Sequence, residues 1–245
     1  MKLSIICIAN DQKIYDDFLE NLAGQKFKDF ELITIMNLNG EYSGARSAFN
    51  EHAKAARGQY LMFIHPDIRF LNENALGDLA GQLDGEMPFG VLGVAGAKAD
   101  GSGGRDILTT IVQGENKESV GKTIDGAVSV QTLDECLFVI ERNYFMEHPF
   151  SRREGWHLYC AEYCLETIKS GMENKAVPSD IWHMSAGKSL DESYMNQLED
   201  LIEEEKDDFD LICTTVKAWK TKGKSAAAYR KYYYYKQLAK RKIKK

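Results

Sequence analysis

The first 64 residues alternate continuous apolar runs with segments of helical periodicity, and this alternation limits the possible folds more than any other feature. Residues 2–10, 30–36 and 59–64 are apolar runs that suit buried strands of a parallel sheet. Between them, residues 13–25 and 46–56 carry apolar or small side chains at helical spacing, and Asp11 can cap the first helix. The order strand–helix–strand–helix–strand predicts a doubly wound α/β sheet with right-handed crossovers.

The third apolar run ends abruptly in His65-Pro66-Asp67. Open α/β sheets bind ligands at the carboxyl ends of their strands, so these side chains are candidate site residues. Hard cations such as Mg²⁺ and Mn²⁺ take carboxylate oxygen, which makes Asp67 a candidate metal ligand. An ordinary turn, in which Asp67 caps the next segment, would explain the same three residues.

The sequence around this strand resembles the nucleotide-sugar half of family-2-type glycosyltransferases, which have the GT-A fold. The resemblance rests on Ala-Arg-x-x-x-Asn at residues 45–50, Ala-x-Gly-x-Tyr-Leu at 56–61 and Phe-Ile-His-x-Asp at 63–67, and it continues to about residue 188. It implies a mixed, mostly parallel sheet with helices on both faces. It also implies that a His-x-Asp motif holds a divalent metal, Mn²⁺ or Mg²⁺, under the sugar diphosphate.

The resemblance implies further residues of the metal and diphosphate site. Many relatives carry a carboxylate where His65 stands, so Asp67 needs a second ligand, and His183 matches a histidine that relatives carry after their last core strand. Histidine favours Mn²⁺ over Mg²⁺. Lys188 can pair with phosphate. A histidine simply packed beside Trp182 is the alternative for His183.

Other polar residues fall in the loops that, in this fold, hold the nucleotide. Asn10 follows the first strand, and Asn37 and Glu41 follow the second, where they can hydrogen-bond the base or the ribose. Asparagine also favours turns in any protein. Arg46, one turn into its helix, can face the phosphates or can be an ordinary surface charge.

The catalytic base is expected near the start of a helix at residues 156–170. Relatives keep an aspartate where this chain has Cys160, and Glu162 occupies the second acidic position. A thiol with a pKa of about 8.5 is a poor base for a sugar hydroxyl, so Glu162 is the predicted base. Asp134 matches a position on the acceptor side. Asp134, Glu135 or Glu154 could instead supply the base, or the chain transfers sugars inefficiently.

Further strands are expected at residues 90–97, 107–112, 127–132, 137–140 and 176–181. Further helices are expected at residues 76–83, 143–147 and 190–205. We predict a GT-A-like nucleotide-sugar-binding and catalytic domain over residues 1–188. A helical C-terminal extension with a basic tail is predicted over residues 189–245.

Composition and charge indicate where such a protein would work. Five widely spaced cysteines, no apolar run long enough to span a membrane and no secretory signal favour the cytoplasm. Residues 217–245 hold 12 Lys and Arg and no acid, whereas the rest of the chain has a net charge of −18. Basic residues mixed with Tyr and Trp suit an anionic membrane face on the inner side. The tail could equally dock on the protein's own acidic helix, and a specific nucleic-acid partner is not expected.

The family resemblance implies an inverting, metal-dependent glycosyltransferase. It would move a sugar from a nucleotide-diphosphate donor to a glycan or lipid-linked acceptor hydroxyl, in polysaccharide biosynthesis. The alternative is a non-catalytic relative that binds nucleotide sugars or positions a partner enzyme, which the Cys160 substitution favours. A nucleotidyltransferase would need a glycine-rich phosphate loop after the first strand, and residues 9–11 do not supply one.

Overall fold

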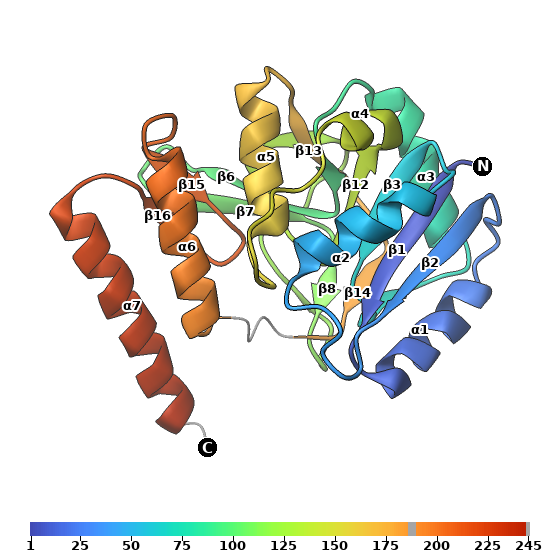
Figure 1. Ribbon diagram of the computed structural model, residues 1–245, viewed down its shortest axis with the longest axis horizontal. Helices are drawn as coiled ribbons and strands as arrows, with labels where there is room; N and C mark the ends of the chain where they lie inside the picture. The colour runs from blue at the N-terminus through green and yellow to red at the C-terminus, as the bar shows by residue number, and fades with distance from the viewer. Residues whose placement is uncertain (186–189, 244–245) are drawn as a thin grey trace.

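The computed structural model describes residues 1–185 and 190–243, with side chains to residue 239. Its centre is a seven-stranded sheet in the order β10-β13-β5-β12-β3-β1-β2 (Figure 1). These strands are β1 (Leu3–Ala9), β2 (Phe30–Met36), β3 (Tyr60–Ile64), β5 (Leu92–Gly93), β10 (Val128–Val130), β12 (Leu137–Glu141) and β13 (Asn174–Ala176). β1 pairs in parallel with both β2 and β3, and β13 with β5, whereas β12 and β10 are antiparallel to their neighbours. Because β10 and β12 run in one direction and the other five strands of this sheet run in the opposite one, the sheet is mixed and mostly parallel, as predicted.

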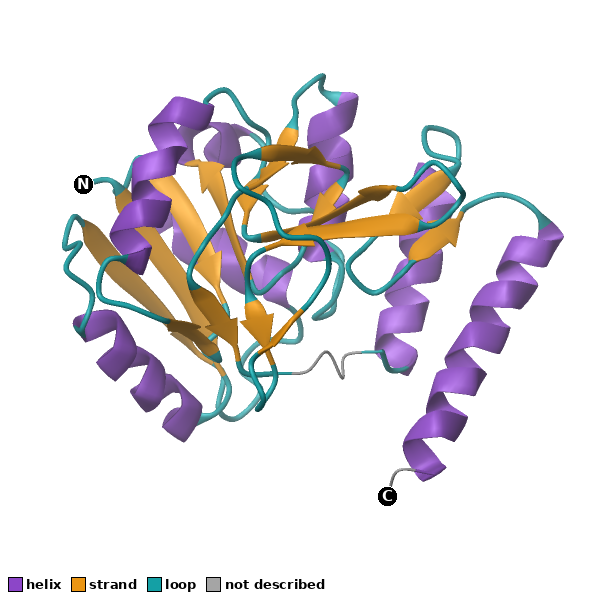
Figure 2. Ribbon diagram, turned by 180° about the vertical axis from the view of Figure 1, so that it is seen from behind, coloured by secondary structure: helices purple, strands orange, loops and turns teal. Residues whose placement is uncertain are grey.

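Both faces of this sheet are buried, which explains the unbroken apolar runs in the sequence. Along β1, Leu3, Ile5 and Cys7 pack into one core cluster and Ile6 into the other, and all four are fully buried. The first cluster includes residues of α1 (Gln12–Ala23) and α3 (Ala75–Glu86). The second includes residues of α2 (Ala45–His52), α4 (Arg142–Glu147) and α5 (Tyr159–Lys169). Figure 2 shows helices covering both faces of the sheet. A 3₁₀ turn, η1 (Ala53–Ala55), follows α2.

Four of the predicted strands, at residues 90–97, 107–112, 127–132 and 176–181, are each split between different sheets. Residues 90–97 form β5 and the start of β6 (Ala95–Ala99), which pairs with β11 (Thr132–Leu133) and β7 (Arg105–Thr109). Gly96 allows β6 to lie close to Val130 of β10, because a Cβ at residue 96 would be only 2.6 Å from Val130 Cγ1. Residues 176–181 span the end of β13 and the start of β14 (Ile181–His183). Pro178 lies between the two strands and has no N–H to continue a ladder.

A four-stranded sheet in the order β4-β14-β8-β9 positions the candidate site. Its strands are β4 (Ile68–Phe70), β8 (Val112–Gln113), β9 (Glu118–Ser119) and β14. β14 is antiparallel to β4, with His183 opposite Ile68. This register brings His183 to the end of β3, where His65-Pro66-Asp67 leads into β4.

The C-terminal region packs against α5 through a third apolar cluster that includes Leu165, Leu198 and Trp219. It comprises α6 (Glu192–Glu205), the hairpin β15 (Leu211–Cys213) and β16 (Ala218–Lys220), and α7 (Lys224–Ile243), the outermost helix in Figure 1. The Arg230 guanidinium pairs with Glu199 of α6. The hairpin, which the sequence reasoning missed, hydrogen-bonds to the first part of the chain, so the division at residue 188 stays a prediction.

All five cysteines are buried and free. Within residues 1–185 and 190–243, no helix combines the length and the apolar character needed to cross a bilayer.

Candidate active site

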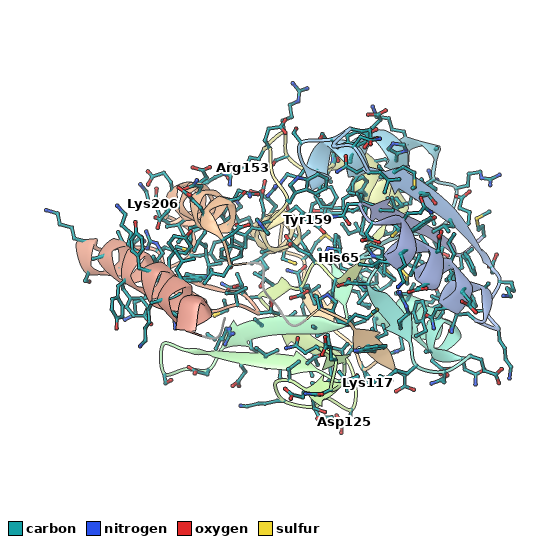
Figure 3. The ribbon with its side chains drawn as sticks, turned by 90° about the horizontal axis from the view of Figure 1, so that it is seen from below. His65, Lys117, Asp125, Arg153, Tyr159 and Lys206 are labelled. Atoms are coloured by element: carbon teal, nitrogen blue, oxygen red, sulfur yellow. The ribbon has the colours of Figure 1, made fainter. Side chains whose placement is uncertain are left out.

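Three predicted metal-site residues meet at the carboxyl end of β3. One ligand atom from each of His65, Asp67 and His183 lies within 4.8 Å of the others. His183 Nε2 is 3.4 Å from Asp67 Oδ2, and the two histidine rings are 6.2 Å apart between centroids. Figure 3 shows His65 and Tyr159 in the middle of the molecule, between the large sheet and the C-terminal helices.

The electrostatics of these residues suit a cation. Burial alone would raise the pKa of Asp67, but the hydrogen bond and charge of His183 outweigh it and lower that pKa to about 2. The carboxylate is therefore ionised. Burial lowers the pKa of His65, whose Nε2 lies 3.1 Å from the Tyr159 hydroxyl, so this imidazole stays neutral. Burial would likewise lower the pKa of His183, but Asp67 outweighs burial and raises it, and a bound cation would have to displace that proton.

Asp67 also has an atom that lacks a partner. Its Oδ1 is buried and accepts no hydrogen bond from any residue that the structure describes. A buried polar atom without a partner is costly, and a coordinated ion would satisfy it. Two imidazoles and one carboxylate are a donor set that divalent cations such as Mn²⁺ accept. The residues present therefore fit a divalent metal.

A cavity of about 530 Å³ opens on one side of this cluster. Asn10 and Asn37 line it, together with Asp67, Trp156 and Tyr159, and their predicted contact with a nucleotide stays a prediction. Asn37 Oδ1 accepts a hydrogen bond from the Tyr42 N–H at 2.8 Å, which orders the loop after β2.

Two other predicted nucleotide residues are not placed in this cavity. Glu41 is exposed, is not among the residues that line it, and accepts hydrogen bonds from Asn39. Lys188 lies outside the described residues. The roles of both stay predictions.

Arg46 and Glu162 form a buried ion pair. The Arg46 Nε and Nη2 atoms lie 2.9 and 2.5 Å from Glu162 Oε2, and the side chains are 2% and 7% exposed. Arg46 is therefore buried, which excludes the alternative in which it is an ordinary surface charge. The pairing engages the charge that each side chain would bring to a substrate, and neither residue lines the cavities that meet at His65. Their predicted roles stay predictions.

A second cavity, of about 400 Å³, lies on the other side of His65. Asp134, Glu135 and His183 line it, and the C-terminal region contributes further residues, including Thr215 of the hairpin loop. Asp134 Oδ1 accepts from the Cys136 N–H at 3.0 Å, and Oδ2 accepts from the Thr215 hydroxyl at 2.6 Å. Asp134 thus lines a different cavity from Asn10 and Asn37, and its acceptor-side role stays a prediction.

The sequence reasoning missed Trp156 and His157, which line the first and second cavity respectively. The helix predicted from residue 156 begins at Tyr159 because Leu158 has a left-handed φ of 61° and Gly155 a φ of 111°. The Gly155 carbonyl accepts from the Ala45 N–H at 3.0 Å, which ties this loop to α2. A glycine directly before two aromatic residues was the available signal for a loop.

The model of a glycosyltransferase-like family matches residues 4–205 of the chain. No curated protein sequence matches the chain.

Several solved structures share the fold. TarS 1–349 from S. aureus, in complex with UDP-GlcNAc, is 17% identical and has a TM-score of 0.55, and the match covers 83% of this chain and 66% of that one. Mannosyltransferase PcManGT from Pyrobaculum calidifontis, in complex with GDP-Man and Mn²⁺, is 11% identical with a TM-score of 0.57, covering 85% and 65%. The catalytic domain of Drosophila β1,4-galactosyltransferase 7, in complex with xylobiose, is 14% identical with a TM-score of 0.51, covering 75% and 71%.

These likenesses confirm the predicted GT-A fold. The chain spans about two thirds of the length of the first two structures.

Proposed function

The chain belongs to the glycosyltransferase-like family whose model it matches over residues 4–205, and from this premise we propose that it transfers a sugar from a nucleotide-diphosphate donor. The acceptor is a hydroxyl of a glycan or of a lipid-linked sugar, and the anomeric configuration inverts. The observation that carries this proposal is that His65, Asp67 and His183 lie together, and that His65 is the one residue, among those the structure describes, that lines both cavities.

Each group has a task in this reaction. Asn10 and Asn37 bind the nucleoside, and the Trp156 ring forms a wall of the same cavity. Asp67 and His183, assisted by His65, would hold a divalent cation against the diphosphate. When bound, that cation neutralises the charge that develops on the departing diphosphate. PcManGT, crystallised with GDP-Man and Mn²⁺, supports manganese as the first metal to test.

The decisive experiment measures donor binding with and without metal. Thermal shifts are recorded for UDP, GDP and their sugar conjugates, each with and without Mn²⁺. We expect a shift that needs both nucleotide and metal in the wild type and in Asp125→Asn, whose exposed carboxylate is far from the site. Asp67→Asn should abolish this Mn²⁺-dependent shift. A metal-independent shift that survives Asp67→Asn would refute the proposed site.

A second candidate function is a non-catalytic nucleotide-sugar-binding protein or scaffold. The Arg46–Glu162 ion pair favours it, because the carboxylate expected to act as base is already engaged. Donor binding without turnover in the presence of any acceptor would support this candidate.

The outer face of α7 supports a place at an anionic membrane surface. Tyr229, Tyr232 and Tyr235 are 45%, 58% and 66% exposed, and Lys231 and Lys236 are exposed beside them. The opposite face packs on α6 through the pair of Arg230 and Glu199, so this helix both docks on the protein and presents a basic, tyrosine-bearing surface. Near an anionic bilayer each such Lys contributes about 1 kcal/mol, and tyrosine rings favour the interface.

A further inference from the structure

The cavity lined by Glu135 and Thr215 has the composition of a sugar site. At about 400 Å³ it falls within the range of small-ligand pockets, roughly 300–1,000 Å³. Hydroxyl, carboxylate, amide and imidazole groups line it beside apolar ones, and a lysine or arginine is not among the lining residues that the structure describes. It therefore suits a neutral, hydroxyl-bearing ligand better than a second phosphate.

The C-terminal extension forms one wall of this cavity. Thr215 of the hairpin loop and Tyr233 and Gln237 of α7 line it. The loop is held in place from the other side, because the Arg105 guanidinium donates to the carbonyl oxygens of residues 214, 215 and 216. The Thr215 hydroxyl donates to Asp134 across the cavity wall.

The four carboxylates considered as the catalytic base differ in the contacts that they already make. Glu162 is paired with Arg46, Asp134 accepts from Thr215 and from the Cys136 N–H, and Glu154 accepts from the Ser43 hydroxyl. Glu135 forms no ion pair with any residue that the structure describes. Its carboxylate accepts hydrogen bonds from the backbone at Tyr159 and Cys160, but its Oε1 is buried and has no partner there.

We propose that this cavity is the acceptor subsite and that Glu135 is the catalytic base. The proposal rests on the proposed function and adds the position of the acceptor and the group that activates it. Glu135 takes the proton of the acceptor hydroxyl while the acceptor oxygen forms a bond to the anomeric carbon of the donor sugar. The bond between that carbon and the diphosphate oxygen breaks, and the nucleoside diphosphate leaves with the bonding electrons.

The protonation behaviour of Glu135 agrees with this role. Burial, together with the negative charge of Asp134, raises the pKa of Glu135 to about 8. A general base works best when its pKa is near the operating pH, because it is then both available and strong enough to take the proton.

The test compares Glu135→Gln with the wild type and with Glu147→Gln, an exposed control on α4. The donor is the nucleotide sugar that gives the largest Mn²⁺-dependent thermal shift, and the acceptors are a panel of p-nitrophenyl glycosides and water. We expect Glu135→Gln to lower release of nucleoside diphosphate by at least about 100-fold, with the Kd for the donor within about twofold. Glu147→Gln should match the wild type. The acidic limb of the wild-type pH profile should be absent from the residual rate of Glu135→Gln.

Replacements of the extension test the acceptor position separately. Gln237→Ala should raise the KM for the glycoside acceptor severalfold without changing the Kd for the donor, even if Glu135→Gln proves difficult to fold. Turnover within about threefold of wild type in Glu135→Gln would overturn the role of Glu135. Donor binding with no turnover of any probe in the wild type would also overturn it. Absence of donor binding would instead refute the proposed function.

Discussion

Replacing Glu162 by Gln distinguishes a structural carboxylate from a catalytic one. The Arg46–Glu162 distance of 2.5 Å corresponds to a gross attraction of about 7 kcal/mol at an effective dielectric constant of about 20. Because both side chains are buried, removing one charge leaves the other uncompensated, which typically costs about 3–5 kcal/mol. The Arg46 guanidinium is already incompletely satisfied, since its Nη1 lacks a hydrogen-bond partner among the described residues.

For a chain of this length, 1 kcal/mol corresponds to a change in Tm of about 2–4 °C, so Glu162→Gln should lower the Tm by roughly 6–20 °C. The measurement is thermal unfolding followed by circular dichroism, with donor turnover assayed well below the new Tm. Glu203→Gln, which breaks the exposed pair with Lys206, is the matched control and should change the stability by less than about 1 kcal/mol.

A double-mutant cycle completes this test. Arg46→Met alone should destabilise the protein by a similar amount, whereas Arg46→Met combined with Glu162→Leu should recover much of the loss, because no buried charge is left unpaired. A Tm of Glu162→Gln within about 2 °C of wild type, accompanied by complete loss of transfer, would refute this reasoning. Glu162 would then be the base.

Three further predictions concern packing, protonation and location. Gly58→Ala should lower the free energy of unfolding, measured in urea, by about 1–3 kcal/mol, because a Cβ at this position would lie 2.4 Å from the backbone nitrogen of Ser4 in β1. An unchanged free energy of unfolding would contradict the close contact. Glu135 retains a proton up to about pH 8 in the folded protein but only up to about pH 4.5 in the unfolded chain, so the stability of the folded protein falls as the pH rises between these values. The Tm of Glu135→Gln relative to that of the wild type should therefore increase over this range. A constant difference in Tm would show that the pKa of Glu135 is ordinary. At low salt the protein should co-sediment with vesicles that contain phosphatidylglycerol but not with vesicles of pure phosphatidylcholine. A variant that combines Lys231→Gln and Lys236→Gln should bind the anionic vesicles roughly 30-fold more weakly, a loss of about 2 kcal/mol. Equal binding to both vesicle types would exclude the electrostatic attraction.

The first three strands of the sheet could be predicted from local sequence patterns. The runs that became β1, β2 and β3 are apolar throughout because their strands are covered on both faces, and their ends were placed within about one residue. His65 and Asp67 were recognisable because they interrupt such a run. His183 was proposed through the family resemblance, and the pairing of β14 with β4 places it close to Asp67.

Features that depend on contacts between distant parts of the chain could not be predicted from the sequence. Nothing near Arg46 indicates that a glutamate in α5 will neutralise it. The helical spacing of Trp156, Tyr159 and Cys160 favoured one continuous helix, and the left-handed turn at Leu158 interrupts it. The hairpin at residues 211–220 has few apolar residues in alternation, and its position depends on the Arg105 guanidinium from a distant strand.

Trp156 and His157 are consecutive in the chain yet face different cavities, and His65 is a wall of both. A donor that bound against Trp156, as proposed, would contact the residue next to His157, so we expect occupation of one cavity to alter the other. The Kd for the donor should therefore differ when an acceptor is bound, and an unchanged Kd would show that the two cavities act independently.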